Sequence, residues 1–248
     1  MWHGDVMTGT GLPDGTHIYQ CTIEDDYSRG YAGDLSTRKD ARIVIGALID
    51  AILRRKSIPT CFHYDNGGEA KCKLVKTFLR NVAERCNHEI TFIPTLVKNP
   101  RGNGKKERAH KDDRRDFWKK NRSKDIEYIR EKFKKYLGWR NEKKGHFALK
   151  GNASVTRLQE NKKPRRIFTK KQLENLAKVK IAERTVKPLG VVYLLNQIYH
   201  VNPKLEGQKV ELWETIKGLE VRKEDMIYHS IEEYWERKSK LSKGAEKT

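Results

Sequence analysis

The fold is decided by residues 2–35, which read WHGDVMTGTGLPDGTHIYQCTIEDDYSRGYAGDL. Apolar residues alternate or cluster there in three short stretches, residues 2–8, 17–24 and 28–35. The segments between the stretches, GTGLPDG at 9–15 and Asp25–Asp26, have the composition of turns. The chain is therefore predicted to begin with three successive antiparallel strands.

The residues that follow change period. Apolar side chains recur at helical spacing over residues 38–56, and the run stops at Pro59. Further elements are predicted in chain order: a strand at 60–64, a helix at 71–86, a strand at 89–93, a glycine-containing loop at 95–104, and helices at about 103–120 and 125–140. The first part of the chain thus has the predicted order βββαβαβ, which indicates an α/β fold.

The C-terminal part has a different composition. A weakly patterned basic stretch extends to about residue 184 and resembles a linker, and β-branched and aromatic residues return over 186–228. Short strands separated by turns favour a small β-barrel there. The predicted division is a core at 1–122, a helical extension and basic linker at 123–184, a barrel at 185–230 and a charged tail at 231–248.

The charge is concentrated in one region. The chain has 53 Lys and Arg against 33 Asp and Glu, a formal net charge of +20, and residues 95–182 alone hold 29 basic and 10 acidic residues, or +19. So basic a block predicts a polyanionic partner, with nucleic acid ahead of an anionic membrane; a solvated basic helix is the alternative.

Some classes of protein are excluded. No apolar run is long enough to span a membrane, no secretory signal is recognisable, and the four cysteines form no CxxC pair. We therefore expect reduced thiols and an intracellular protein, in the cytoplasm or nucleoid if the host is prokaryotic. The absence of a GxxxxGK[ST] sequence argues against a nucleotide triphosphate as cofactor.

Three carboxylates stand at boundaries of the predicted elements: Asp5 in the first strand, Asp65 after the fourth, and Glu107 on the helix after the glycine loop. Adjacent strands would bring Asp5 close to Asp65, and the helix could place Glu107 over both. Such oxygen-only ligands suit Mg²⁺ or Mn²⁺, and the implied chemistry is phosphoryl transfer. Taken singly, each carboxylate could equally be an exposed strand, turn or helix residue.

The residues around these carboxylates resemble the catalytic core of DDE transposases and retroviral-type integrases. The matching motifs are Trp2-His3-Gly4-Asp5, Asp25-Asp26-Tyr27-Ser28-Arg29, Tyr64-Asp65-Asn66-Gly67-Gly68-Glu69 and Asn103-Gly104-Lys105-Lys106-Glu107-Arg108-Ala109-His110. The resemblance covers about residues 2–120, and Tyr136–Gly151, with Trp139-Arg140-Asn141 and His146, is similar to the segment that follows such cores.

The resemblance implies an RNase H-like core, with a mixed five-stranded sheet and flanking helices, and a terminal barrel of SH3-like architecture. It also implies that Asp5, Asp65 and Glu107 hold two Mg²⁺ or Mn²⁺ ions. Glu69 is the main alternative to Glu107 and is expected at the surface. We expect Asp25 and Asp26 to set a turn and to pair with Arg29.

Basic residues near Glu107 are candidates for DNA contact. His110, Lys111 and Arg114 follow Glu107 by three, four and seven positions and so share its helix face, although His110 could be structural. The resemblance supports DNA contact at this face. The basic track is extended by Lys98, Arg101, Lys105, Lys106, Arg108 and Arg115. His3 and His63 are expected to be packed strand residues.

The resemblance implies metal-dependent DNA strand transfer, in which the enzyme cuts the ends of a mobile element and joins the 3′-hydroxyl to target DNA. It also implies a homo-oligomer on DNA and an upstream recognition domain that this chain is expected to lack. Two alternatives stay open: a DNA-binding protein that has lost catalysis, and an RNase H-like nuclease that only hydrolyses.

Overall fold

The computed structural model describes the chain except for residues 65–67, 95–103, 123–124, 161–164, 225 and 239–248. The chain divides into two compact units, Met1–Leu176 and Ala177–Thr248. Each unit is described by itself below.

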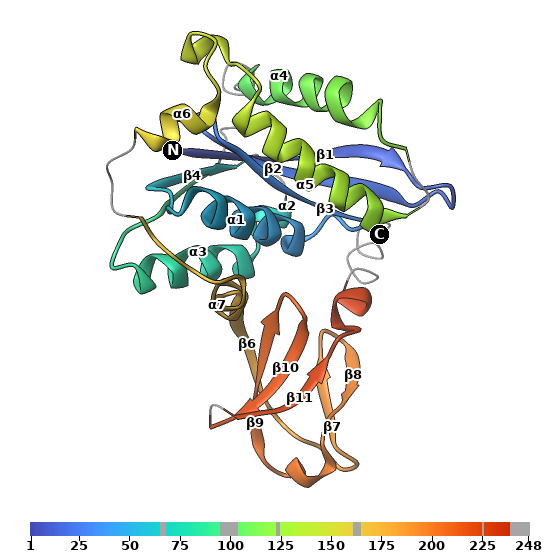
Figure 1. Cartoon of the computed structure of the whole chain (residues 1–248). Helices are drawn as coiled ribbons and strands as arrows, with labels where there is room; N and C mark the ends of the chain where they lie inside the picture. Colours follow the sequence, from blue (N-terminus) through green and yellow to red (C-terminus); the bar gives the residue numbers. More distant parts are fainter. Residues whose placement is uncertain (65–67, 95–103, 123–124, 161–164, 225, 239–248) are drawn as a thin grey trace. The chain divides into compact units, whose positions relative to one another are not determined.

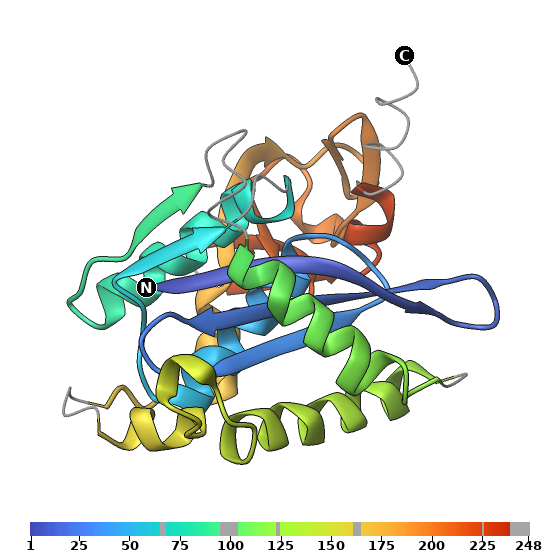
Figure 2. The ribbon, with the colours of Figure 1, turned by 90° about the horizontal axis from the view of Figure 1, so that it is seen from above.

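The first unit is built on a mixed five-stranded sheet, as the sequence predicts (Figures 1 and 2). The strands are β1 (Trp2–Gly11), β2 (His17–Asp25), β3 (Tyr31–Ser36), β4 (Cys61–Tyr64) and β5 (Thr91–Pro94), in the order β3-β2-β1-β4-β5. The first three strands pair antiparallel, and β4 and β5 run parallel to β1. β1 therefore lies at the centre of the sheet.

Helices flank both faces of this sheet (Figure 1). They are α1 (Ala41–Arg55), α2 (Gly68–Lys71), α3 (Lys73–Arg85), α4 (Gly104–Asp113), the π-helix η2 (Arg114–Trp118), α5 (Ile126–Glu142), the 3₁₀ turn η3 (Phe147–Leu149), α6 (Ser154–Gln159) and α7 (Lys170–Leu176). α1 and α3 lie on one face, and α4 and α5 lie on the other. Asp40 caps α1, its carboxylate accepting a hydrogen bond from the Arg42 amide.

Gly4 lets the two central parallel strands pack closely. Its neighbours across the sheet are the buried rings of Phe62 and Tyr64 on β4. A Cβ atom built on Gly4 would lie 2.6 Å from Cδ2 of Tyr64 and 2.9 Å from Cζ of Phe62. Since real Cβ contacts are longer than this, only glycine fits at this point of β1.

The other face of the sheet forms a core with α4, η2 and α5. Its buried members are Met7, Ile18, Tyr31, Leu35, Ala109, Phe117, Trp118, Ile129, Phe133, Tyr136 and Leu137. The change from α-helix to π-helix after Asp113 widens the turn that carries Phe117 and Trp118 into this core. The helix predicted at 103–120 is thus observed as α4 followed directly by η2.

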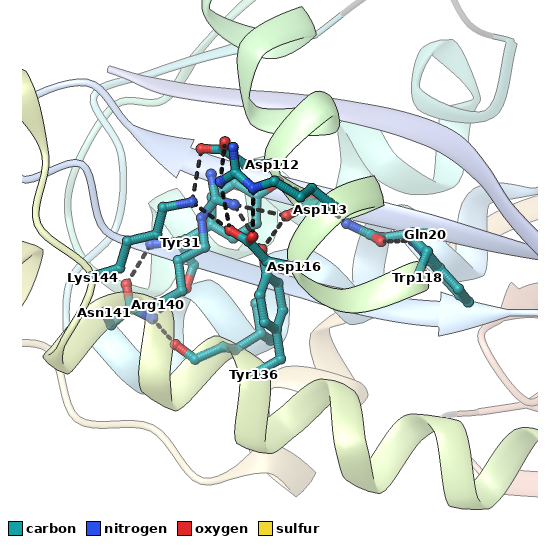
Figure 3. Close-up of polar contacts among 12 residues, drawn as sticks. Gln20, Tyr31, Asp112, Asp113, Asp116, Trp118, Tyr136, Arg140, Asn141 and Lys144 are labelled. Atoms are coloured by element: carbon teal, nitrogen blue, oxygen red, sulfur yellow. Dashed lines mark hydrogen bonds and ion pairs between the residues drawn. The ribbon is translucent and has the colours of Figure 1, made fainter. Parts of the chain in front are cut away.

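A buried ion pair lies within this core (Figure 3). The side chains of Asp113 and Arg140 are 0% and 2% exposed, and Nη1 of Arg140 lies 2.7 Å from Oδ1 of Asp113. The same oxygen accepts from the Tyr136 hydroxyl at 2.7 Å, while Oδ2 accepts from Gln20 Nε2 at 2.5 Å and from the Tyr31 hydroxyl at 2.6 Å. Four donors from β2, β3 and α5 therefore meet one carboxylate at the end of α4.

Tyr31 and Tyr136 must be protonated to donate to Asp113, and their pKa values agree with this. Burial, followed by the charge of Asp113, raises the pKa of both Tyr31 and Tyr136 well above the usual value for tyrosine. Both hydroxyls therefore stay protonated and donate hydrogen bonds to the Asp113 carboxylate. The Arg140 guanidinium also lies over the Tyr31 ring, 3.7 Å from its centroid.

The predicted linker contains ordered elements. α6 and α7 lie within it, and β6 (Lys178–Thr185), the first strand of the second unit, begins inside it. The sequence analysis did not recognise β6 as a strand because charged residues interrupt its apolar pattern. One of them, Lys180, forms an ion pair with Glu211 of the neighbouring strand in the sheet. The four-part division predicted from the sequence stays a prediction.

The second unit contains two sheets. Strands β6, β9 (Lys209–Thr215), β10 (Gly218–Lys223) and β11 (Met226–Ile231) form one in the order β11-β10-β9-β6, and β7 (Val191–Leu194) pairs with β8 (Gln197–His200) in the other. A 3₁₀ turn, η4 (Pro203–Leu205), lies between β8 and β9. Among the described strands the pairing does not close into a ring, so the predicted SH3-like barrel is not confirmed.

Part of the predicted charged tail is packed in the second unit. Tyr234 and Trp235 are buried, the Tyr234 hydroxyl donates to the buried carboxylate of Glu214 at 2.5 Å, and Trp235 Nε1 donates to the carbonyl of Thr215 at 2.9 Å. Burial, followed by the Glu214 charge, raises the pKa of Tyr234 well above its usual value. Residues from 239 onward lie outside the described part of the chain.

Two general predictions can be compared with the structure. Cys21, Cys61, Cys72 and Cys86 are all free. Among the residues that the structure describes, no helix combines the length and apolar character that crossing a membrane requires.

We predict that Asp113→Asn destabilises the protein strongly, because it leaves the buried charge of Arg140 without a counterion. The expected loss in the free energy of unfolding is about 3–5 kcal/mol, measured by urea denaturation. The matched control is Glu131→Gln, which removes a carboxylate from the exposed pair with Lys135 and should cost less than about 0.5 kcal/mol. Equal effects of the two changes would show that the Asp113 network does not stabilise the core.

We also predict that His146 stays neutral in mildly acidic solution. Burial, together with the charges of Arg140, Lys144 and Arg29, lowers its pKa to about 4. Because the folded state binds this proton less readily than the unfolded state, His146 should lower stability as pH falls from about 6.5 toward 4. NMR titration of the His146 ring should give a midpoint near 4, and near 6.5 in urea; a folded-state midpoint near 6.5 would contradict the burial argument.

Candidate functional site

Asp5 lies near the middle of β1, on the sheet face covered by α4 and α5. Its Oδ1 accepts a hydrogen bond from the Val6 amide at 2.8 Å, and its side chain is partly exposed. In the parallel pairing with β4, Gly4 is the partner of Tyr64. Asp5 directly follows Gly4, and Asp65 directly follows Tyr64. Asp65, however, lies outside the described residues.

α4 brings a second predicted site residue to Asp5. Nε2 of His110 lies 3.8 Å from Oδ2 of Asp5, and the imidazole is mostly buried. His110 follows Glu107 by three positions, about one helical turn. The side of α4 that carries Glu107 therefore contacts the strand that carries Asp5, and Glu107 itself is exposed to solvent.

His110 thus has a contact within the protein. Of the two roles considered from the sequence, DNA contact and a structural role, this contact favours the second. It joins α4 to β1 at the residue that the motifs assign to the metal site.

Two further histidines lie on the same face of the sheet. His3 and His63 are register partners on β1 and β4, and their rings meet edge to face with centroids 5.1 Å apart. Nε2 of His3 lies 3.9 Å from Oδ1 of Asp26. Both histidines are partly buried strand residues, in agreement with the sequence prediction.

The turn after β2 is also as predicted. Oδ2 of Asp25 accepts from both the amide and the hydroxyl of Ser28, at 3.0 and 2.6 Å. Asp26 pairs with Arg29 at 3.0 Å. These two carboxylates stabilise the β2–β3 turn.

Glu69 is not the surface residue that the sequence analysis expected. Its side chain is 8% exposed, with Oε1 3.8 Å from Nζ of Lys39 and 3.5 Å from the hydroxyl of Tyr64. The expectation was wrong because α2 returns the chain alongside the end of β4, where Glu69 meets Tyr64. Burial raises the pKa of Tyr64 well above its usual value, so its hydroxyl remains a donor.

The predicted DNA-binding residues fall into three groups. Lys98 and Arg101 lie outside the described residues, and Lys105 and Lys106 belong to α4 but their side chains are not described. Arg108, Lys111, Arg114 and Arg115 are exposed on α4 and η2, and His110 is mostly buried against Asp5. The assignment of these residues to DNA stays a prediction.

Arg115 differs from the other exposed cations because acidic neighbours on its own helix engage it. It contacts Asp116 at 2.7 Å and Asp112 at 2.9 Å, and Lys144 of the segment after α5 contacts the same two carboxylates at 3.0 and 2.8 Å (Figure 3). The hydrogen bond from Arg115 holds the pKa of Asp116 well below its ordinary range. Partial burial by itself would raise the pKa of Asp112, but the hydrogen bond and charge of Lys144, with the charges of Arg140 and Arg115, together lower it.

The sequence analysis did not single out these acidic residues of α4 and η2. Asp112, Asp113 and Asp116 read as part of a mixed charge run, and only the tertiary structure separates the buried Asp113 from its two neighbours. A signal for the partner was present, because Arg140 lies in the Trp139-Arg140-Asn141 motif.

The oxygen ligands fit a hard cation in type, but the described residues do not complete a site. In the part of the chain that the structure describes, no three His, Cys, Asp or Glu side chains are grouped closely enough to hold a metal ion. Asp5 and Glu107 supply carboxylates on neighbouring elements, which is the donor chemistry that Mg²⁺ prefers. Asp65, the third predicted ligand, is not among the described residues.

We predict that His110→Ala loosens α4 from the sheet. Loss of a partly buried contact worth about 1 kcal/mol should speed hydrogen exchange of the α4 amides roughly fivefold, as measured by mass spectrometry. Lys111→Ala, at the exposed neighbouring position, is the control and should leave exchange unchanged. Equal exchange in the His110→Ala variant and the wild type would mean that the Asp5 contact does not hold the helix.

Comparisons with known proteins agree with the motifs at the level of the fold. No protein-family model matches this sequence, and no curated protein matches it. The chain is similar to a chain of the simian T-cell lymphotropic virus intasome in complex with PP2A regulatory subunit B56 gamma, with a TM-score of 0.52 and 13% identity over 91% of this chain and 79% of that chain.

Two further solved structures are similar over a smaller share of the chain. They are the HTLV-2 integrase catalytic core domain in complex with magnesium in its dimeric form (TM-score 0.41, 14% identity, 64% of this chain and 94% of that chain) and in its trimeric form (0.43, 16%, 62% and 93%). The likeness to the intasome chain confirms, at the level of the fold, the resemblance to retroviral-type integrases that the motifs carry.

Proposed function

We propose that this protein is a metal-dependent DNA strand transferase of the DDE transposase and integrase type. The observation that carries the proposal is the meeting of α4 and β1, where His110 lies against Asp5 one helical turn from Glu107. The β1–β4 register supports it, because Asp5 and Asp65 directly follow paired residues of parallel neighbouring strands. The integrase-like fold gives the proposal its reaction class.

In this proposal Asp5, Asp65 and Glu107 hold two Mg²⁺ or Mn²⁺ ions. When bound, the ions supply the positive charge that favours the attacking oxygen and stabilises the leaving oxygen. The reaction exchanges one phosphodiester for another. The 3′-oxygen of the cut end bonds to a target phosphorus and the target P–O3′ bond breaks. The proton of the attacking hydroxyl passes to solvent, and the leaving 3′-oxygen takes up a proton from solvent. No nucleotide triphosphate is required.

The chain's basic residues would hold the DNA beside these carboxylates. Lys111 and Arg114 lie four and seven positions after Glu107 and are exposed, so they can reach phosphates near the scissile bond. Arg108 would extend this contact, as would Lys98, Arg101, Lys105 and Lys106. Arg115 would contribute less, because Asp112 and Asp116 already engage its guanidinium.

Holding two DNA ends and a target requires more than one active site. We therefore also propose that the protein acts as a homo-oligomer on DNA, as the resemblance implies. The large positive charge of residues 95–182 supports such an assembly, because it would offset the repulsion between closely spaced DNA segments.

We predict that the wild-type protein, with Mg²⁺ or Mn²⁺, releases and rejoins strands of a branched DNA that mimics a strand-transfer product. Glu107→Gln should lower this rate by at least about 100- to 1,000-fold, because it removes a charged metal ligand without changing side-chain size. Glu69→Gln, the same change at the rival carboxylate, should retain activity. The assay is separation of labelled strands on a denaturing gel.

The other outcomes distinguish the alternatives. Cutting without rejoining would favour the hydrolytic nuclease, and tight DNA binding with no reaction in any variant would favour the inactive binding protein. A loss of activity in Glu69→Gln but not in Glu107→Gln would assign the third ligand to Glu69.

A further inference from the structure

An exposed aromatic side chain stands on the loop between α5 and α6. Phe147 is 92% exposed, the highest value among the large apolar residues that the structure describes. A single exposed apolar residue needs no explanation by itself. For Phe147, the backbone geometry of the loop and the neighbouring side chains together point to a binding role.

The backbone of the loop fixes the position of Phe147. The His146 amide donates to the Asn152 carbonyl at 3.0 Å, the Gly151 amide donates back to the His146 carbonyl at 3.0 Å, and Gly145 and Ala153 form a bridge at the base. A Cβ on Gly145 would lie 2.4 Å from the Gly151 carbonyl oxygen, so the two sides of the loop touch. Phe147 is thus presented by a closed loop.

The loop is attached to the helix that carries the candidate site. Nζ of Lys144 pairs with Asp112 of α4 and with Asp116 of η2, at 2.8 and 3.0 Å (Figure 3). On the other side, the hydroxyl of Ser154 donates to Asn141, whose amide is bonded to the backbone of Tyr31. Phe147 is therefore held in a fixed relation to α4 and to Glu107.

Cations of the loop and of α6 lie against two further exposed aromatic rings. Lys143 and Lys150 are exposed on the loop, whereas Lys144 pairs with Asp112 and Asp116 and Arg157 lies 3.2 Å from Glu160. The exposed rings of Trp139 and Tyr27 lie near two of these cations: Lys144 Nζ is 5.9 Å from the Trp139 centroid, and Arg157 Cζ is 4.8 Å from the Tyr27 centroid. Exposed aromatic faces interleaved with positive charge are the combination that single-stranded nucleic acids require.

We propose that this surface, formed by Phe147, Trp139, Tyr27 and the basic residues of 143–158, binds an unpaired DNA segment, with a base stacked on Phe147. The inference rests on the proposed function in taking DNA as the ligand. Duplex DNA hides its base faces, so the surface would select strands that are single or opened. The exposed Lys143 and Lys150 would hold the phosphates, and the closed loop would lower the entropy cost of stacking.

The test is DNA binding by the full chain in EDTA, where no metal-dependent reaction occurs, using fluorescence anisotropy of a labelled single strand and of its duplex. Phe147→Ala should weaken single-strand binding about tenfold and duplex binding less than about twofold. Phe147→Trp should bind as the wild type does. The matched control is Ile167→Ala, at another apolar residue of the first unit, 81% exposed, and it should change neither affinity.

Several results would overturn the inference. These are an unchanged single-strand affinity in Phe147→Ala, an equal loss in Ile167→Ala, or an equal loss for single strand and duplex. Binding of anionic phospholipid vesicles that depends on Phe147, without such dependence for DNA, would assign the surface to a membrane instead. Thermal denaturation of each variant checks folding, which a change at so exposed a position should not alter.

The result is separable from that of the strand-transfer assay. If the wild type joins strands but Phe147→Ala binds single strands normally, only the stacking surface is disproved. If no strand transfer occurs but Phe147→Ala loses single-strand binding, the surface stands and the proposed reaction fails.

Discussion

The buried pairing of Asp113 with Arg140 is the constraint on which the first unit depends. One carboxylate accepts hydrogen bonds from Gln20 of β2, Tyr31 of β3, and Tyr136 and Arg140 of α5. Breaking any of these contacts would leave a buried polar group unsatisfied, so the helices and strands that contribute them are held together. Because Asp113 is the last residue of α4, the network also fixes the end of the helix that carries Glu107.

The candidate site is held between this network and the centre of the sheet. At one end of α4 the network joins the helix to β2, β3 and α5, and nearer Glu107 the contact between His110 and Asp5 joins it to β1. On the opposite face of β1, the absence of a side chain at Gly4 allows the rings of Phe62 and Tyr64 to pack directly against the strand. A strand and a helix far apart in sequence thereby bring Asp5 and the Glu107 face of α4 together.

Charge in the middle of the chain serves two purposes in this arrangement. Arg140, Lys144 and Arg115 are paired with Asp113, Asp112 and Asp116 and stabilise the fold. Arg108, Lys111 and Arg114 lie exposed on the same helical segment, where the proposed function assigns them to DNA. Within this basic region, pairing with Asp112, Asp113 or Asp116 thus distinguishes the cations that stabilise the fold from those that remain available to a ligand.

The sequence by itself determined the order of the core elements, because the change between strand and helix periods is a local property of the chain. Its motifs predict Asp5, Asp65 and Glu107 as metal ligands. The predicted positions of His3 and His63 in strands and of Asp25 and Asp26 in a turn agree with the structure. The sequence could not determine which charged residues are buried, since Asp112, Asp113 and Asp116 are alike in a local pattern and differ only in what packs against them. For the same reason it missed Glu69, which α2 turns toward Tyr64, and β6, whose charges are paired across the sheet. Those features depend on partners distant in sequence, so only the tertiary structure could decide them.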